Sequence, residues 1–380
     1  MSHRGSRIAA IVGLFCVAAF GIYFSLPGLR PLVDLGGFIE SGRALRAGLD
    51  PYGAYPMPPR ALVAGQPVPW PNANPPLSLP LDVVLSLLDP PAAQLVWWVI
   101  SLVVYLAAVA LLIREHPRSD RLLVSAWVLA ISPFWLTLGE QVYPVLAVAA
   151  VASWTLLKRE RRLMAALPLG LLIALKPNFA LWPFSLLLVG EVAPAALSLA
   201  VALALTALPI AWYGLIVYQE WLHALVAYPY APWAAGQSVF SIGLYLGHPE
   251  WGDAIGLALA VLLCFGWLVW LRRIRGDLLR VSEGALILTL LISPVSWDGY
   301  LLLLLPVFVW RPLHLPGKLA AGLMVIGVAV PIVHWPIAGL LLIDHLLDGR
   351  LRVRPTSPDA PASTAAATRG VARRFRPSPG

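Results

Sequence analysis

Charged residues are scarce in this chain. Of its 380 residues only 12% are Asp, Glu, Lys or Arg, whereas 59% are hydrophobic. A soluble domain typically carries about twice that charged fraction, so the composition excludes a soluble domain of any size and predicts an integral membrane protein. The net charge of +8 does not indicate nucleic-acid binding, because the basic residues fall in short clusters between apolar runs.

Cysteine is almost absent. The two that occur, Cys16 and Cys264, lie inside apolar segments, and we expect both to be buried thiols without a disulfide. The chain also lacks zinc-ligand spacing, a phosphate-binding glycine loop and a nucleophile elbow. We therefore expect neither a metal nor a cofactor.

Long apolar runs dominate what is present. The first extends from Ile8 to Leu26, which is too long for a typical signal-peptide core, so we expect an uncleaved anchor. Further spans are centred near Val104, Ala130, Ala149, Leu171, Leu187, Leu203, Leu262, Leu288, Leu304, Val325 and Leu341. These runs predict an all-α polytopic membrane protein with about 11–12 transmembrane helices, forming one domain over residues 1–347.

Basic clusters orient the predicted spans. They comprise Arg4 and Arg7; Arg114, Arg118 and Arg121; Lys158, Arg159, Arg161 and Arg162; Arg272, Arg273, Arg275 and Arg280; and Arg311 with Lys318. The positive-inside rule assigns them to the cytoplasm and makes residues 30–94 the first extracytoplasmic loop. Residues 348–380, rich in Pro, Ala, Ser and Arg, predict a disordered basic cytoplasmic tail that touches anionic lipid.

The first outer loop carries the strongest local pattern. Residues 36–47 predict a short amphipathic helix that lies in the membrane interface and ends at Gly48. Asp34 precedes it and is either a helix N-cap, which the local pattern favours, or a general base at the membrane surface. Further along, the prolines between Pro69 and Leu81 argue against a regular helix.

Other outer-side polar residues have two interpretations each. Asn72 and Asn74 are turn residues, which we favour, or sugar-binding amides. Lys176 interrupts an apolar run, and it either snorkels to the interface or meets a phosphate. Asp298 either caps the next helix or is a second acid facing the same cavity as Asp34.

The order of these motifs resembles glycosyltransferase family 87, membrane enzymes of the C-type glycosyltransferase architecture that use polyprenyl-phosphate sugars. The elements that carry the resemblance are Asp34; Phe38; Gly42-Arg43; Gly48-Leu49-Asp50-Pro51-Tyr52; Asn74-Pro75-Pro76-Leu77, similar to the family's Y-P-P-L; Glu140-Gln141-Val142-Tyr143, similar to its G-Q-x-N; Lys176-Pro177; Gly236-Gln237-Ser238-Val239, similar to its N-Q-S-L; and Ser293-Pro294-Val295-Ser296-Trp297. The resemblance extends over roughly residues 8–308. Gly299 departs from it, because family members often carry a histidine there.

The resemblance implies a function at the outer face of a plasma membrane. Asp34 would be the general base, and Lys176 and Arg43 would meet the phosphate of the donor. Gln141, Gln237, Trp297 and Asp298 would bind substrate. We expect transfer of a sugar, mannose, from a polyprenyl-phosphate donor to an extracytoplasmic glycan or glycolipid, with membrane lipid around the protein and no nucleic acid bound.

Two alternatives remain open at this point. A transporter or flippase of lipid-linked sugar would also have many spans with polar breaks, but it predicts paired acids near the midplane and repeated halves. Here the polar residues gather at the outer ends of the spans, which favours an enzyme. A non-catalytic relative is the second alternative.

Overall fold

The computed structural model describes residues 3–29, 32–55, 62–63, 66–67, 72–227, 238–274, 276–294, 296–327 and 335–352. Within these ranges the protein is helical apart from turns and one pair of two-residue antiparallel strands, β1 (Leu62–Val63) and β2 (Gln66–Pro67). The predicted all-α polytopic fold is confirmed. Gln237 and residues 353–380 of the predicted tail lie outside the described residues.

Four described helices are long and apolar enough to cross a membrane by themselves, namely α1 (His3–Ser25), α4 (Pro90–Arg114), α10 (Val192–Tyr213) and α13 (Gly252–Ile274). Intermediate helices are α5 (Arg121–Ala130), α7 (Tyr143–Lys158), α8 (Arg162–Leu175), α14 (Leu278–Ile292), α16 (Leu315–Ile326) and α17 (Trp335–Arg352). Large side chains such as Leu262 and Phe265 of α13 remain exposed, as expected for a surface that meets lipid rather than water.

Several predicted spans are broken into short pieces. These are α6 (Ser132–Thr137), η2 (Pro177–Ala180), α9 (Leu181–Leu188), η5 (Asp298–Leu304) and α15 (Leu305–Val309). Pro133, Pro177 and Pro306 stand in the first turn of α6, η2 and α15. Proline lacks the backbone N–H that a continuing helix needs, so each begins a new segment. Every predicted span centre nevertheless falls in a helical segment.

α2 (Val33–Arg46) is the short helix that the sequence predicts over residues 36–47. Helices also occur where the sequence predicts loops: η1 (Pro76–Ser78) and α3 (Leu79–Ser86) precede α4, and α11 (Ile216–Ala227), η3 (Val239–Ser241), α12 (Ile242–Tyr245) and η4 (Pro249–Trp251) lie between α10 and α13. The argument against a helix up to Leu81 is therefore wrong at its end. Pro80 occupies the first turn of α3 and costs it no hydrogen bond.

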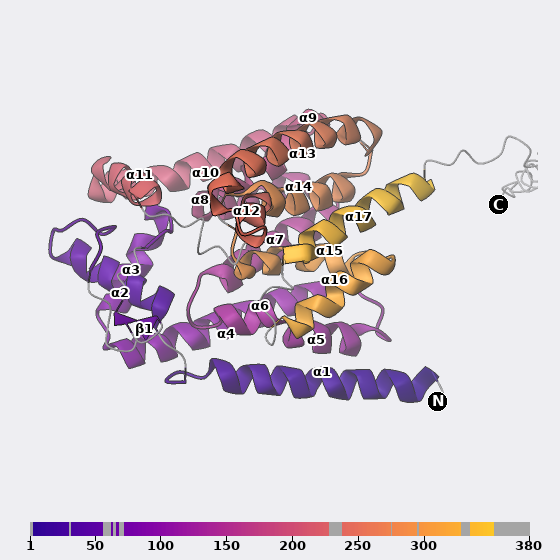
Figure 1. Ribbon diagram of the computed structural model, residues 1–380, viewed down its shortest axis with the longest axis horizontal. Helices are drawn as coiled ribbons and strands as arrows, with labels where there is room; N and C mark the ends of the chain where they lie inside the picture. The colour runs from indigo at the N-terminus through magenta and orange to yellow at the C-terminus, as the bar shows by residue number, and fades with distance from the viewer. Residues whose placement is uncertain are drawn as a thin grey trace, which may run out of the picture.

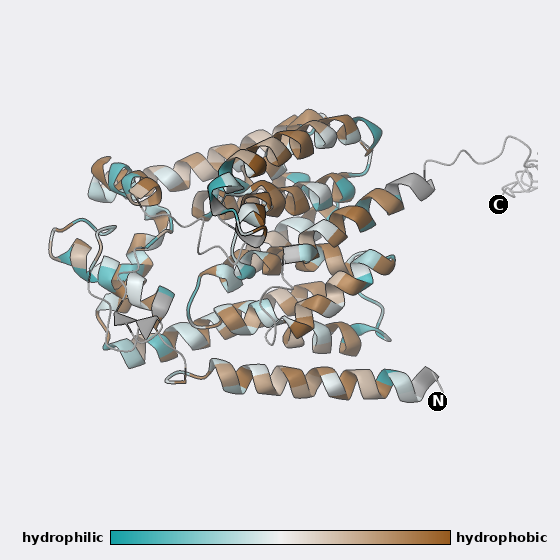
Figure 2. Ribbon diagram, in the orientation of Figure 1, coloured by the Kyte–Doolittle hydropathy of each residue, from teal (hydrophilic) through white to brown (hydrophobic). Residues whose placement is uncertain are grey.

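The helices run along a common direction, and the two ends of the bundle differ. The start of α1 and the end of α17 lie at one end, whereas α2, α3 and α11 lie at the other (Figure 1). Hydrophobic residues cover the lengths of the helices, and hydrophilic ones concentrate at their ends (Figure 2).

Glu115 joins two basic clusters by pairing with Lys158 at 3.3 Å and Arg159 at 2.5 Å.

A buried ionic cluster ties α17 to α14 at the end with the basic clusters. The Arg311 guanidinium lies 2.6 Å from Oε1 of Glu283 and 2.8 Å from Oδ2 of Asp344, and all three side chains are almost fully buried. Arg280 also pairs with Asp348. Asp348 therefore belongs to α17, which extends five residues, 348–352, into the segment predicted as tail.

The two cysteines are not buried as predicted. Cys16 is exposed and Cys264 is half-buried, because each lies on a side of α1 or α13 that faces away from the other helices. A thiol is a small apolar side chain, so a lipid-facing position is compatible with its chemistry.

Candidate functional site

Asp34 lies in the first turn of α2 rather than at its N-cap. The N-cap is Leu32, which makes no side-chain cap hydrogen bond. The backbone N–H of Leu35 instead points to Oε2 of Glu140, 3.4 Å away, which comes from the turn between α6 and α7. The N-cap interpretation of Asp34 is therefore wrong, because a carboxylate 105 residues away in the sequence takes that place.

Glu140 is itself held in place. Its Oε1 accepts a hydrogen bond from Nε2 of Gln94 at 3.2 Å, and Oε1 of Gln94 accepts from the backbone N–H of Gly28 at 3.1 Å. These contacts join the end of α1, the start of α4 and the α6–α7 turn to the start of α2. Asp34 consequently stands on a firmly anchored part of the segment between α1 and α3.

Lys176 does not snorkel to the surface. It follows the end of α8, where Pro177 prevents the helix from continuing, and its side chain is buried with 8% of its surface exposed. Its Nζ donates a 2.9 Å hydrogen bond to Oδ1 of Asn74. The Asp34 carboxylate lies within electrostatic range of this ammonium.

Aromatic rings surround the Lys176 ammonium. Nζ lies 5.4 Å from the ring centroid of Tyr143 and 5.6 Å from that of Tyr300. The two rings are 5.1 Å apart, and Phe179 stacks on Tyr300 at 5.7 Å. Ring faces attract cations and repel anions, so the pocket favours a localised positive charge. We define Asp34, Asn74, Tyr143, Lys176 and Tyr300 as the Lys176 cluster.

Trp297 and Asp298 enter from the break after α14. Trp297 is the N-cap of η5 and Asp298 is its first residue, so the interpretation of Asp298 as a helix cap is wrong. Both Asp298 and Asp34 act electrostatically on Tyr143. The two acids thus lie within electrostatic range of the same tyrosine, although they come from different segments of the chain.

Two predicted site residues lie apart from the contacts described so far. Arg43 is exposed and pairs with Glu40 at 2.6 Å, one turn earlier on α2. Gln141 is half-buried in the α6–α7 turn, where its backbone N–H donates to the carbonyl of Thr137 at 3.1 Å. Neither has a described contact with the Lys176 cluster. Gln237 lies outside the described residues.

Sequence reasoning offered Asn74 only as a turn residue or a sugar-binding amide, and it missed Tyr143 and Tyr300 as members of the site. The turn interpretation is right for Asn72, whose Oδ1 accepts from the backbone N–H of Asn74 at 2.9 Å, but the Asn74 side chain points to Lys176. One feature of the sequence could have pointed to Asn74 and Tyr143. Asn74 stands where the family pattern Y-P-P-L has tyrosine, and Tyr143 stands where the pattern G-Q-x-N has asparagine.

The departures from the family pattern are neighbours in space. Asn74 binds the Lys176 ammonium, and Tyr143 lies beside that ammonium. A Cβ atom added to Gly299 would overlap Cδ2 of Tyr143. The tyrosine ring thus occupies the space into which a histidine at position 299 would extend. Glycine at position 299 therefore leaves room for the Tyr143 ring, which any larger residue there would meet.

Replacing Gly299 with histidine is expected to destabilise the protein by about 1–3 kcal/mol, because the new side chain meets the Tyr143 ring in a packed interior. Adding Tyr143→Asn should restore most of that stability by vacating the space. Thermal unfolding of the purified protein in detergent compares the two variants. A double variant no more stable than Gly299→His alone would contradict the packing explanation.

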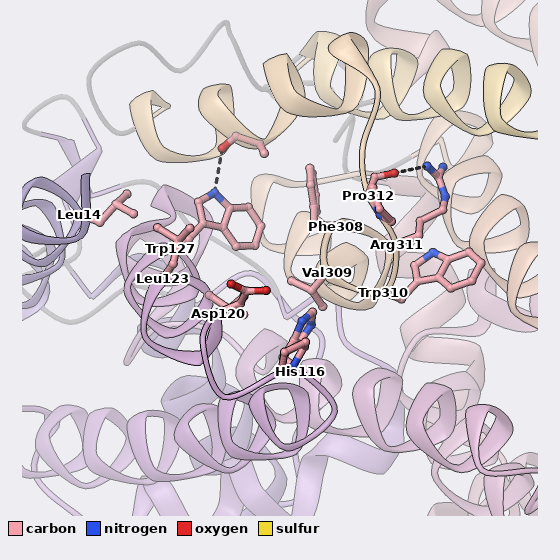
Figure 3. Close-up of a pocket in the computed structure, with 13 residues that line it drawn as sticks. Leu14, His116, Asp120, Leu123, Trp127, Phe308, Val309, Trp310, Arg311 and Pro312 are labelled. Carbon is pink, nitrogen blue, oxygen red and sulfur yellow. Dashed lines mark hydrogen bonds between the residues drawn. The ribbon is translucent and has the colours of Figure 1, made fainter. Parts of the chain in front are cut away.

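A cavity of about 610 Å³ lies elsewhere, near the end of the bundle that carries the basic clusters. Figure 3 shows Leu14, Trp127 and Phe308 around it, with His116 and Asp120 close by. Trp127 donates from Nε1 to the carbonyl of Ala321 at 3.0 Å and so joins α5 to α16. The residues that line this cavity include none of the predicted site residues.

The chain was compared with known proteins. The model of glycosyltransferase family 87 matches residues 72–294, which is more than half of the chain. The match includes Asn74, Gln141 and Lys176 and begins after Asp34. No curated protein and no solved structure matches the chain. The matched region contains the α6–α7 turn and Lys176, which lies between α8 and η2. Because the match covers more than half of its length, the chain belongs to glycosyltransferase family 87.

Proposed function

We propose that this glycosyltransferase moves a sugar, mannose, from a polyprenyl-phosphate donor to a glycan or glycolipid on the extracytoplasmic face of the plasma membrane. The observation that supports the proposal is the buried Lys176 ammonium, held by Asn74 and within electrostatic range of the Asp34 carboxylate. A base for the acceptor and a cation for the departing phosphate are the two groups that such a transfer needs.

The reaction balances with these two residues. The Asp34 carboxylate accepts the proton of an acceptor hydroxyl as that oxygen attacks the anomeric carbon of the sugar. The bond between the anomeric carbon and the phosphate oxygen breaks, and the electron pair leaves with the polyprenyl phosphate. The Lys176 ammonium stabilises the charge that develops on this phosphate. Attack from the side opposite the leaving group inverts the anomeric configuration.

The remaining predicted residues have supporting roles in the proposal. Trp297 offers a ring face on which a sugar stacks, and Asp298 and Gln141 offer acceptors and donors for sugar hydroxyls. Arg43, exposed on α2, meets the phosphate of the approaching donor. Gln237 binds substrate from the segment after α11. The basic clusters at the opposite end of the bundle support an outer-face location by the positive-inside rule.

Deletion of the gene separates the proposed enzyme from a flippase. Loss of the enzyme leaves unextended acceptor on the outer face while the lipid-linked sugar donor accumulates there. Loss of a flippase strands the lipid-linked sugar on the cytoplasmic face. The measurement is a profile of lipid-linked sugars and envelope glycans, combined with the accessibility of the donor to a membrane-impermeant oxidant.

A deletion strain with donor trapped inside would contradict the enzyme and support the transporter. Complementation by the Asp34→Asn variant would favour the third alternative, a non-catalytic partner. Expression of the wild-type gene in the same strain is the matched control, and it must restore the original profile.

A further inference from the structure

A chain of buried hydrogen bonds leads from α3 to the Lys176 ammonium. Oδ2 of Asp82 accepts from Nδ2 of Asn72 at 2.8 Å. Oδ1 of Asn72 accepts from the backbone N–H of Asn74 at 2.9 Å, and Oδ1 of Asn74 accepts from Nζ of Lys176 at 2.9 Å. All four side chains are buried.

We propose that Asp82, Asn72 and Asn74 are positioning residues that hold the Lys176 ammonium in its place. That this ammonium binds the phosphate of the lipid donor rests on the proposed function above. The inference gives Asp82 a first role, and it gives Asn72 and Asn74 a role other than that of turn residue or sugar-binding amide. It also gives a reason for an asparagine at position 74.

The geometry of Lys176 shows why such support is needed. A lysine has a long flexible side chain whose rotamer freedom costs up to about 2 kcal/mol to restrict. The two tyrosine rings attract the ammonium but fix no single orientation, because the attraction depends mainly on distance to a face. The Asn74 oxygen supplies a directional partner, and its orientation is set by the Asn72 contact with the adjacent backbone.

Further contacts hold the Asp82 end of this hydrogen-bond chain and the backbone of Asn74. Oδ2 of Asp82 also accepts from the Ser78 hydroxyl at 3.3 Å. Gly42 of α2 packs directly on the backbone of Asp82, where a Cβ atom would overlap the carbonyl oxygen. The Tyr52 hydroxyl donates to the carbonyl of Asn74 at 3.1 Å. The segment that presents Asn74 is thus fixed at both ends.

The four-residue chain joins two segments that meet only in the folded protein, because Asn74 and Lys176 are 102 positions apart. A merely structural amide would affect folding but not the reactivity of one lysine. Positioning predicts that loss of the Asn74 acceptor changes Lys176 specifically. The protein contains three lysines, Lys158, Lys176 and Lys318, so the other two report on general unfolding.

The first experiment measures reductive methylation of the three lysines in the full-length protein in detergent, followed by mass spectrometry. It requires no substrate. Asn74→Leu and Asp82→Leu are expected to speed methylation of Lys176 about tenfold, the change that corresponds to losing one hydrogen bond to a charged group. Asp82→Asn keeps an oxygen that accepts from Asn72 and Ser78, so it should behave as the wild type.

Two controls accompany the labelling. Rates at Lys158 and Lys318 should not change in any variant. Trp127→Phe removes a hydrogen bond of similar length at the opposite end of the bundle and should leave the Lys176 rate unchanged. An unchanged Lys176 rate in Asn74→Leu, or equal acceleration of all three lysines, would overturn the positioning role.

The second experiment is a double-mutant cycle on transfer from polyprenyl-phosphate mannose. Asn74→Leu is expected to raise KM for this donor about tenfold without changing KM for the acceptor. Combined with Lys176→Met, it should add nothing to the loss caused by Lys176→Met alone, because both remove the same interaction. Effects that multiply would overturn the inference.

The two experiments distinguish failure of the positioning role from failure of the proposed function. Selective acceleration of Lys176 labelling in a protein whose wild type transfers nothing from the lipid donor would leave positioning intact and overturn the proposed function. Transfer from the lipid donor by the wild type, together with losses that multiply in the Asn74→Leu, Lys176→Met double variant, would support the proposed function and overturn the positioning role.

Discussion

Replacing Asp34 with asparagine is expected to reduce sugar transfer by about 10²–10⁴-fold, the contribution typical of a general base. Asparagine preserves the size of the side chain but cannot accept the proton of the acceptor hydroxyl at neutral pH. The Glu140 contact to the start of α2 does not involve the Asp34 side chain, so the helix should stay in place. The measurement is transfer of label in membranes supplied with radiolabelled lipid donor, normalised to the amount of protein.

Glu40→Gln is the matched control for Asp34→Asn. Glu40 is a carboxylate on the same helix, but it pairs with Arg43 near the surface. Exposed pairs contribute little, so this variant should change transfer by less than about threefold. A comparable loss in both variants would mean that α2 needs negative charge in general and would contradict the assignment of Asp34 as the base.

Replacing Arg311 with methionine is expected to lower the free energy of unfolding by about 3–5 kcal/mol, because Glu283 and Asp344 would remain buried without their cation. This is the largest stability effect that the described contacts predict. Since Arg311 joins α14 to α17, the C-terminal helix should detach first. Unfolding of the purified protein in detergent, followed by tryptophan fluorescence and size-exclusion chromatography, measures the change.

Two variants test the cause of this instability. Arg7→Met removes an exposed pair with Asp120 at the same end of the bundle and should cost no more than about 1 kcal/mol. The triple variant Arg311→Met, Glu283→Leu and Asp344→Leu removes the cation and both carboxylates and should recover most of the lost stability. A triple variant as unstable as Arg311→Met would show that packing, rather than uncompensated charge, sets the loss.

The fold could be predicted where a pattern is local and strong. Apolar runs marked every helical segment that spans or partly spans the membrane, and the amphipathic pattern located α2 to within three residues at its start. α11 escaped prediction because its twelve residues hold Glu220 and His223 among apolar ones, which places it below the hydropathy of a span. The Arg311 cluster escaped because its members are distant in the sequence.

Sequence reasoning singled out Asp34 and Lys176 individually but did not predict the contacts around them. Asp34 and Lys176 stand out in the sequence because an acid near a membrane surface and a lysine in an apolar run both carry a free-energy cost. Their contacts could not be inferred, since Glu140, Asn74 and Tyr143 come from other segments. Local pattern therefore favoured the N-cap for Asp34 and left snorkelling and phosphate binding open for Lys176, whereas the structure places Asp34 inside α2 and buries Lys176.

The departures from the family pattern illustrate the same limit. In the sequence, Asn74, Tyr143 and Gly299 are three separate differences from the family pattern. In the folded protein Tyr143 fills the space beside Gly299 and also lies next to the lysine that Asn74 binds. Their proximity in the folded protein could not be inferred from their separate positions in the sequence.

Transfer in sealed right-side-out vesicles tests the central claim most directly. Wild-type protein receives labelled polyprenyl-phosphate mannose on the outside, and a parallel sample receives labelled nucleoside-diphosphate mannose with synthesis of the lipid donor blocked. The account predicts label in the acceptor from the lipid donor alone. Transfer from the nucleotide sugar, or transfer only when the lipid donor is supplied to the cytoplasmic face, would contradict it.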